Sequence, residues 1–303
     1  MVPADPQMPA PSPRISFVTA LYNRLELTRA FLNSLEETVR GIPFEIILID
    51  DGSTDGTRRY LETLEDQTHV QVVLNETNRG FAYNNNLGAR LAQADTLCLL
   101  NNDLVLTPGW LEPMLEQFDT LPQIGVLGNI QYNARTGLID HAGVFFDQNG
   151  QPAHARKNRK KIPRGPWKEW FAVTAACVLV RKQVFEELGG FDDSYRNGME
   201  DIDFCVRLKQ AGYRNYVCNL SKIYHHVSSS PGRLEYNDSN MRLFLKRWSH
   251  LTSRWGTSEW AAEYLSRNAR QLWRFNLKKL FLAFWMLARR PFSRNAGSSG
   301  GDR

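Results

Sequence analysis

The chain has 303 residues, 42% of them hydrophobic and 23% charged, so it is long enough for one large or two small soluble domains with a real core. No apolar run approaches the roughly 18 to 20 residues that a membrane-spanning helix needs. The net charge of +5 is unevenly placed, because from Trp260 onward nine Lys and Arg stand against two acids, while the rest of the chain is slightly acidic.

The two ends and the cysteines indicate a cytoplasmic protein. Residues 1–13 are rich in proline and lack the basic segment and apolar stretch of a signal peptide, so we expect a disordered lead-in. Residues 291–303 are expected to form a disordered tail. The four cysteines are scattered and form no Cys-x-x-Cys pair, which predicts buried free thiols in a reducing compartment.

The first hundred residues alternate between strand and helix patterns. Apolar runs bounded by polar residues predict strands over 14–20, 44–50, 70–74 and 97–100. Helical spacing of apolar residues predicts helices over 25–39, 58–64 and 81–92. This alternation predicts an α/β fold with a mostly parallel central sheet covered by helices on both faces.

The pattern is less regular beyond residue 110. We expect helices over 110–118, 182–188 and 200–211, and strands over 124–130, 171–180 and 213–218. Residues 136–166 carry turn signals, little periodicity and a basic cluster at 156–161. That cluster is either a solvated loop or a contact for an anionic substrate.

Acidic residues follow apolar runs at three places: Asp50-Asp51, Asp103 and Glu200-Asp201. Ligands of open α/β sheets lie just beyond the carboxyl ends of the strands, so Asp103 is expected where a metal-bound diphosphate would sit. Asn101-Asn102-Asp103 is also good turn chemistry.

Two further patterns each allow two interpretations. His225 either completes the shell of a cation at Asp103, where an imidazole would suit Mn²⁺ better than Mg²⁺, or has a structural role. Glu200 and Asp201 open a helix, whose N-terminus stabilises acids, or they include a general base for an attacking hydroxyl.

A series of motifs between Arg14 and His226 resembles the family 2 glycosyltransferases, most closely the rhamnosyltransferase-like branch that builds bacterial cell-surface polysaccharides. The motifs are Val18-Thr19-Ala20-Leu21-Tyr22-Asn23, Asp50-Asp51-Gly52-Ser53-Thr54-Asp55, Asn78-Arg79-Gly80-Phe81-Ala82, Asn101-Asn102-Asp103, Gly189-Gly190-Phe191-Asp192 and Glu200-Asp201-Ile202-Asp203.

The resemblance implies a GT-A fold over residues 14–235, with a Rossmann-like nucleotide-binding half and an acceptor-binding half. It implies a nucleotide-diphosphate sugar donor, a Mg²⁺ or Mn²⁺ ion and inversion at the anomeric carbon. The acceptor would be a glycan or lipid-linked glycan, in O-antigen or capsule synthesis, and no nucleic-acid partner is expected.

The resemblance also implies roles for single residues on the donor side. Asp51 matches the acid that holds the nucleotide base or ribose. Thr19 and Tyr22 match the end of the first strand, which lines the base pocket. Arg79 and Asn102 lie in motifs expected to contact the donor.

The chemistry is carried over in the same way. Asp103 matches the last carboxylate of the Asp-x-Asp motif, a metal ligand, and His225 matches a histidine that reaches the metal or diphosphate in some members. Asp201, with its neighbour Glu200, matches the catalytic base. The sequence departs from the family at Asn101-Asn102, which weakens the first ligand, and at Tyr83-Asn84-Asn85-Asn86, where glycines are more usual.

Two other function classes fit the sequence less well. A sugar-phosphate nucleotidyltransferase would carry a Gly-rich loop with Arg and Lys after the first strand, where this chain has Tyr22-Asn23-Arg24-Leu25-Glu26. A basic nucleic-acid-binding or membrane-binding protein without enzymatic activity would explain the tail but not the three acidic clusters.

Residues 236–290 are expected to form C-terminal helices. Arg267, Arg270, Arg274 and Lys278 are spaced three, four and four residues apart, which predicts a basic stripe on one helical face, and 280–288 is apolar throughout. Such a segment either packs on the catalytic body or lies on the anionic cytoplasmic face of a membrane.

Overall fold

The computed structural model describes residues 12–227, 235–255, 257–269 and 276–288. The strands are β1 (Ile15–Leu21), β2 (Phe44–Asp50), β3 (Val70–Leu74), β4 (Thr96–Leu100), β5 (Leu104–Val105), β6 (Ile124–Asn133), β7 (Ile139–His141), β8 (Val144–Phe146), β9 (Pro152–His154), β10 (Trp167–Trp170), β11 (Cys177–Arg181) and β12 (Arg214–His225). The helices are α1 (Leu25–Thr38), α2 (Thr57–Glu62), α3 (Phe81–Leu91), α4 (Glu112–Thr120), α5 (Lys182–Glu187), α6 (Glu200–Gln210), α7 (Asn237–Trp255), α8 (Thr257–Asn268) and α9 (Leu277–Ala288).

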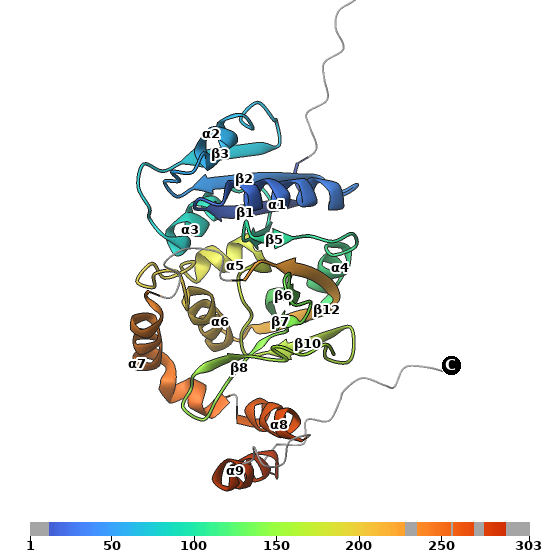
Figure 1. The fold of residues 1–303 in the computed structure, drawn as a ribbon, viewed down its shortest axis with the longest axis vertical. Helices are drawn as coiled ribbons and strands as arrows, with labels where there is room; N and C mark the ends of the chain where they lie inside the picture. Colours follow the sequence, from blue (N-terminus) through green and yellow to red (C-terminus); the bar gives the residue numbers. More distant parts are fainter. Residues whose placement is uncertain (1–11, 228–234, 256, 270–275, 289–303) are drawn as a thin grey trace, which may run out of the picture.

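One mixed sheet forms the centre of the molecule, in the order β10-β12-β6-β11-β4-β1-β2-β3 (Figure 1). The run β4-β1-β2-β3 is parallel throughout, which confirms the alternation predicted from the first hundred residues. β11 is antiparallel to both of its neighbours, β4 and β6, and β12 returns parallel to β6. The C-terminal half of the sheet is therefore mixed.

Helices cover both faces of the sheet, and successive residues of each strand point to opposite faces, so each strand contributes to two cores. Phe17 of β1 packs in one core with Phe31 of α1 and Phe118 of α4. Val18, the next residue, packs in the other core with Ala89 of α3 and with side chains of α5 and α6. The strands are apolar on both faces for this reason, and the four cysteines are buried and free, as predicted.

Close packing of α3 on the sheet depends on Gly88. A Cβ at this position would lie 2.3 Å from Cγ1 of Val18 and 2.8 Å from Cδ1 of Ile49, both closer than real contacts allow. The helix can therefore approach β1 and β2 only with a glycine here, and this approach brings the start of α3 close to the carboxyl ends of those strands.

Two parts of the chain differ from the prediction. The segment 136–166, predicted as a loop, contains β7, β8 and β9, of which β8 and β9 form a separate hairpin. The strand predicted over 171–180 begins only at Cys177. Strands of three residues are too short to show a period of two, so their pairing partners, not their sequences, define them.

The C-terminal helices pack in different ways. α7 contacts the body closely, with Phe244 fully buried and stacked on Phe146, whereas α8 and α9 pack against each other at the end of the molecule farthest from β3 (Figure 1). The single basic stripe predicted over 267–278 is wrong, because Asn276 is not helical and Arg267 and Lys278 belong to different helices. Arg270 and Arg274 lie outside the described residues.

The predicted domain boundaries remain predictions. α7 begins at Asn237, next to the boundary predicted at 235. Residues 1–11 of the predicted lead-in and the whole predicted tail lie outside the described residues. Among the helices of the described ranges, none has the length and apolarity needed to cross a bilayer.

Candidate active site

The carboxyl ends of β1, β2 and β4 lie side by side at one edge of the sheet. Leu21, the last residue of β1, is paired in register with Asp50, the last residue of β2. The backbone N–H of Asp51 donates to the carbonyl oxygen of Leu21 at 2.7 Å, which ties the two strand ends together. The predicted donor residues and Asp103 therefore extend from the same edge.

Asp51 fixes the loop that leads into α3. Its Oδ1 accepts a hydrogen bond from the N–H of Arg79 at 2.7 Å, and its Oδ2 accepts one from Gly80 at 3.0 Å. The side chain is only 4% exposed. Its predicted contact with the base or ribose would have to use the remaining lone pairs of these two oxygens, and it stays a prediction.

Two neighbouring acids are also held by backbone N–H groups. Asp50 accepts from the N–H of Ser53 at 3.1 Å, and burial raises its pKa despite that hydrogen bond. Asp55 joins the starts of two helices, because its carboxylate accepts from the N–H groups of Leu25 and Thr57. Burial alone would raise the pKa of Asp55, but hydrogen bonds from Thr57 and Leu25 outweigh it and lower the pKa.

The other predicted donor residues lie in different environments. Thr19 is fully buried in the sheet, on the same side of β1 as Phe17 and Leu21, and its expected place in the base pocket stays a prediction. Tyr22 is 39% exposed and can reach a ligand. Asn102 donates from Nδ2 to Oγ1 of Thr28 at 2.9 Å, a contact that anchors the loop on α1.

Arg79 lies on the surface beside this edge, with its guanidinium 4.4 Å from the centre of the Tyr83 ring. Tyr83 belongs to the segment that departs from the glycines usual in the family. The aromatic ring thus supports the one cationic side chain predicted to contact the donor.

Asp103 and His225 face each other, although they come from distant parts of the chain. β5 follows Asp103 directly and pairs Leu104 with His225 of β12. Oδ1 of Asp103 lies 3.2 Å from Nε2 of His225, and the two side chains are 11% and 4% exposed. A further backbone hydrogen bond, from the N–H of His226 to the carbonyl oxygen of Asp103 at 2.8 Å, fixes the pair.

This geometry fits a small divalent cation. Two ligands at right angles on an octahedral ion with bonds of about 2.1 Å lie about 3 Å apart. Both ring nitrogens of His225 are buried, and among the described residues neither forms a hydrogen bond. A carboxylate oxygen and an imidazole nitrogen at this separation suit Mn²⁺ or Mg²⁺, with the remaining ligands from phosphate oxygens or water.

Asp140, on β7, is a site residue that the sequence interpretation missed. Its Oδ2 lies 3.7 Å from Nδ1 of His225, on the side of the ring away from Asp103, and its Oδ1 lies 3.4 Å from Nζ of Lys157. Lys157 belongs to the basic cluster 156–161, in which Arg156 and Lys157 form ion pairs within the chain, whereas Lys160 and Lys161 are exposed. The one sequence signal for a role of Asp140 is the neighbouring His141, in a segment that has little periodicity.

Two further histidines, His141 and His154, lie next to Asp140. Nδ1 of His141 lies 3.1 Å from Nδ1 of His154, and Nε2 of His141 accepts from the N–H of Gly143 at 3.2 Å. Neutral His141 must therefore carry its proton on Nδ1. Burial is the main cause that holds its pKa well below the usual value, with smaller effects from His154, His225 and Lys157.

Asp201 lies in the first turn of α6, where free backbone N–H groups stabilise an ionised carboxylate. Its Oδ2 accepts from the N–H of Ala175 at 3.1 Å and its Oδ1 accepts from Ile202 at 2.8 Å. The side chain is half-buried. Glu200, only 4% exposed, instead accepts from the N–H of Gly198 at 2.6 Å and closes the preceding loop.

The segment before β11 connects Asp201 to the end of β4. The N–H of Asn101 donates to the carbonyl oxygen of Ala176 at 2.9 Å, and the neighbouring Ala175 holds Asp201. On the other side, Oδ1 of Asn197 accepts from the N–H of Phe81 at the start of α3. These contacts join the loop before α6 to the same sheet edge as Asp51 and Asp103.

Comparison with known protein families identifies the family of this chain. The profile described as "Glycosyl transferase family 2" matches residues 16–189, more than half of the chain. The chain belongs to glycosyl transferase family 2. This confirms the resemblance seen in the sequence, and the comparisons give no support to a nucleotidyltransferase or a nucleic-acid-binding protein.

Two bacterial relatives are named for O-antigen biosynthesis and for rhamnosyl transfer. The O-antigen biosynthesis protein RfbC of Myxococcus xanthus is 31% identical over 232 residues, which are 72% of this chain and 18% of that protein. The N-acetylglucosaminyl-diphospho-decaprenol L-rhamnosyltransferase of Mycobacterium tuberculosis is 27% identical over 221 residues, which are 63% of this chain and 69% of the relative. The chain spans less than a third of the first relative and of another from Sinorhizobium fredii.

Solved structures of glycosyltransferases share the fold. GalNAc-T7 with UDP, GalNAc and Mn²⁺ gives a TM-score of 0.61 at 16% identity, over 78% of this chain and 50% of that chain. The mannosyltransferase PcManGT from Pyrobaculum calidifontis, in complex with GDP-Man and Mn²⁺, gives 0.53 at 17% identity, over 91% and 80%. The GT-A fold predicted from the sequence is therefore confirmed.

Proposed function

We propose that this family 2 chain is an inverting glycosyltransferase that moves a sugar from a nucleotide-diphosphate sugar to a hydroxyl of a glycan or lipid-linked glycan. The observation that carries the proposal is the buried Asp103–His225 pair at the same sheet edge as Asp201. A glycosyl transfer needs an electrophilic group near the leaving diphosphate and a base near the attacking hydroxyl, and this edge offers residues for both.

On the donor side, we infer that the nucleotide lies over the loops after β1 and β2. Tyr22 is exposed at the end of β1, and Asp51 is held rigid by two backbone N–H groups. Arg79, supported by Tyr83, places a positive charge where it can contact the anionic donor.

Asp103 and His225 would hold the divalent cation, which supplies positive charge that stabilises the leaving diphosphate. Asp140 would act as a positioning residue for His225. A histidine that binds a metal through one nitrogen usually directs its other nitrogen to a carboxylate, which fixes the ring and its tautomer. The positions of Asp103 and Asp140 on opposite sides of the His225 ring suit this arrangement.

On the acceptor side, Asp201 would remove the proton from the attacking hydroxyl, taking it onto a carboxylate oxygen as the new glycosidic bond forms. Inversion requires the hydroxyl and the departing diphosphate to lie on opposite faces of the sugar. The backbone N–H groups of Ala175 and Ile202 hold the carboxylate in one orientation.

The acceptor class and the place of action rest on the relatives. One is named for O-antigen biosynthesis and another for rhamnosyl transfer to a lipid-linked sugar, which supports a role in O-antigen or capsule synthesis. A lipid-linked acceptor would place the protein at the cytoplasmic face of a membrane as a peripheral protein.

A panel of nucleotide-sugars tests the proposal. Each is added with Mn²⁺ and the midpoint of thermal unfolding is measured, since a ligand that binds the folded state raises its stability by mass action. We expect one donor to raise the midpoint and to be consumed when a polyprenyl-diphosphate-linked sugar is supplied. Stabilisation by no member of the panel, together with no transfer, would contradict the proposal.

A further inference from the structure

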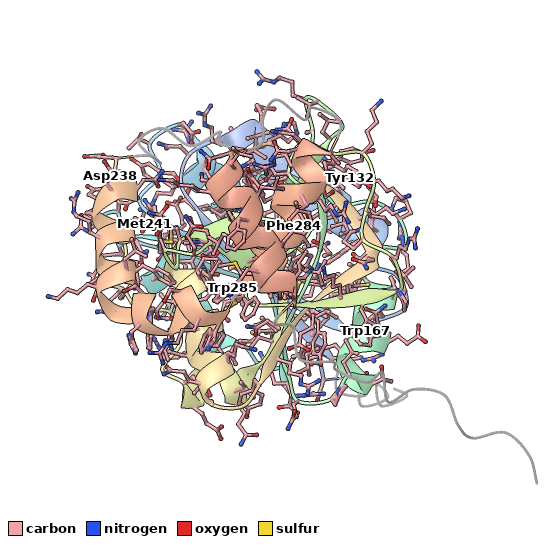
Figure 2. The ribbon with its side chains drawn as sticks, turned by 90° about the horizontal axis from the view of Figure 1, so that it is seen from below. Tyr132, Trp167, Asp238, Met241, Phe284 and Trp285 are labelled. Carbon is pink, nitrogen blue, oxygen red and sulfur yellow. The ribbon has the colours of Figure 1, made fainter. Side chains whose placement is uncertain are left out.

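The helix α9 presents a stripe of large apolar side chains to solvent. Leu277 is 82% exposed, Phe281 75%, Phe284 59% and Trp285 44%. Their spacing of four, three and one residues places them on one helical face. Ala283, on the opposite side, is fully buried. Figure 2, which views the molecule from below, shows Phe284 and Trp285 on a helix at the front.

The buried side of α9 is held by α8, and α8 is held by the catalytic body. Oδ1 of Asn276 accepts from the N–H of Lys279 and caps the start of α9, while the N–H of Asn276 donates to the hydroxyl of Tyr264 on α8 at 2.9 Å. Arg156 of the body lies 3.4 Å from the carboxylate of Glu263 on α8. The apolar stripe is therefore presented in a fixed orientation.

The charged residues of α9 are all basic. Lys278 and Lys279 are exposed in the first turn of α9, and α9 contains no acidic residue. In the sequence, Arg289 and Arg290 follow it directly. Glu263, one of the two acids beyond Trp260, is only 8% exposed and lies beside Arg156, so it does not offset these charges at the surface.

The dimensions and composition of α9 suit a lipid surface. Twelve residues extend about 18 Å as a helix, which is too short to cross a hydrocarbon core of about 30 Å. Trp and Phe on one face with Lys beside them are typical of helices that lie in the interface plane.

We propose that α9 docks on an anionic lipid surface, with Leu277, Phe281, Phe284 and Trp285 entering the acyl boundary and Lys278, next to Trp285 on the helix, among the headgroups. This inference deepens the peripheral location proposed above, and it rests on that proposal only for the choice of a membrane. It replaces the predicted basic stripe with an apolar face that Lys278 borders.

The test is co-sedimentation of the full chain with phosphatidylcholine vesicles that contain rising fractions of phosphatidylglycerol, without donor or acceptor. We expect the double variant Phe281→Glu/Phe284→Glu to bind at least about tenfold more weakly. The matched control is Leu220→Glu, because Leu220 is 56% exposed but lies on β12. Its binding should equal that of the unchanged chain.

A second variant separates the charge contribution. Lys278→Gln should weaken binding to anionic vesicles about fivefold, because a basic residue near such a surface contributes about 1 kcal/mol, and the effect should shrink at high salt. Lys279→Gln should have a smaller effect, because Lys279 lies on the side of the helix that carries Ala283. All variants should keep the thermal midpoint of the unchanged chain, since the substituted side chains are exposed.

Three results would overturn the proposal. One is failure of the unchanged chain to sediment with anionic vesicles at low salt. Another is an equal loss of binding in Leu220→Glu. The third is a dimer in analytical ultracentrifugation that the double Phe variant disperses, since a second copy would then cover the face. Sugar transfer to a water-soluble acceptor, measured separately, shows whether the proposed reaction stands or fails independently of lipid binding.

Discussion

The carboxylates at the end of β2 and in the loop after it have different partners from the carboxylates around His225, at the end of β12. Asp50, Asp51 and Asp55 accept hydrogen bonds from backbone N–H groups, so they build and fix the loops of the donor side. Asp103 and Asp140 instead lie on either side of the His225 ring. The first group stabilises backbone, whereas the second surrounds a side chain that can bind a ligand.

Asp201 stands between these two cases. It accepts two backbone hydrogen bonds, as Asp51 does, but it is half-buried where Asp51 is 4% exposed. A carboxylate that is rigid and still accessible suits a general base. The comparison predicts that changes around His225 and Asp201 alter chemistry more than stability, and that changes after β2 do the reverse.

The largest effect is expected for Asp201→Asn, which keeps the shape and removes the base. Turnover should fall by roughly 10²–10⁴-fold, the usual contribution of a general base. Stability should fall by only about 1 kcal/mol, because the amide can accept just one of the two backbone hydrogen bonds. The matched control is Glu200→Gln, whose amide oxygen can still accept from Gly198 and which should lose much less. Turnover of Asp201→Asn within about threefold of the unchanged enzyme would remove the assignment.

A smaller effect is expected for Asp140→Asn. Weakening the carboxylate beside Nδ1 of His225 should reduce the affinity for Mn²⁺ by about 10–100-fold, as is usual when a residue behind a ligand is changed. Free Mn²⁺ can be measured by electron paramagnetic resonance, without any turnover. Asp119→Asn, a half-exposed surface acid, is the control. Equal Mn²⁺ affinity in all three proteins would mean that Asp140 has no positioning role.

Acidification should destabilise the region through His141. Its folded-state pKa lies well below its unfolded value, so the unfolded chain binds the proton more readily, and stability is lost as the pH falls through the unfolded pKa of about 6.5. Between pH 7.5 and 5.5 this group alone should lower the free energy of unfolding by about 1.4 kcal/mol. Urea unfolding of His141→Gln should lack this part of the decrease. His250→Gln, on the exposed side of α7, should retain it.

The smallest effect is expected for Asp55→Ala, in the loop after β2. It removes the acceptor of the N–H groups of Leu25 and Thr57, which should cost about 1 kcal/mol of stability, as for a lost helix cap. Affinity for Mn²⁺ should not change, because the carboxylate of Asp55 contacts Leu25 and Thr57 and not the proposed metal ligands. A fall in Mn²⁺ affinity as large as that of Asp140→Asn would show that the two regions are not separate.

The sequence was most informative where strands are apolar on both faces. β2 and β3 have the predicted bounds and β1 and β4 begin within one residue of them, because a buried parallel strand is a run of apolar residues with polar ends. Segment 136–166 could not be predicted, since its strands have three residues each and depend on partners elsewhere in the chain.

The candidate site was only partly predictable for a similar reason. The Asp103–His225 pair followed from the family resemblance, whereas Asp140 is defined by a contact with a histidine on a strand far along the chain. Thr19 is buried because helices cover both faces of the sheet, which its polar side chain does not reveal. The helix break at Asn276 depends on its capping of α9 and its contact with Tyr264, which no helical periodicity reveals.

The central claim is that Asp103 and His225 hold the cation that supports transfer from a nucleotide-sugar. The most direct measurement is Mn²⁺ affinity, by electron paramagnetic resonance, in the unchanged chain and in Asp103→Asn, followed by turnover in EDTA and after Mn²⁺ is restored. We expect Asp103→Asn to bind Mn²⁺ at least about tenfold more weakly, and we expect EDTA to abolish turnover that Mn²⁺ then restores. Equal affinity in both proteins, with full turnover in EDTA, would contradict the account.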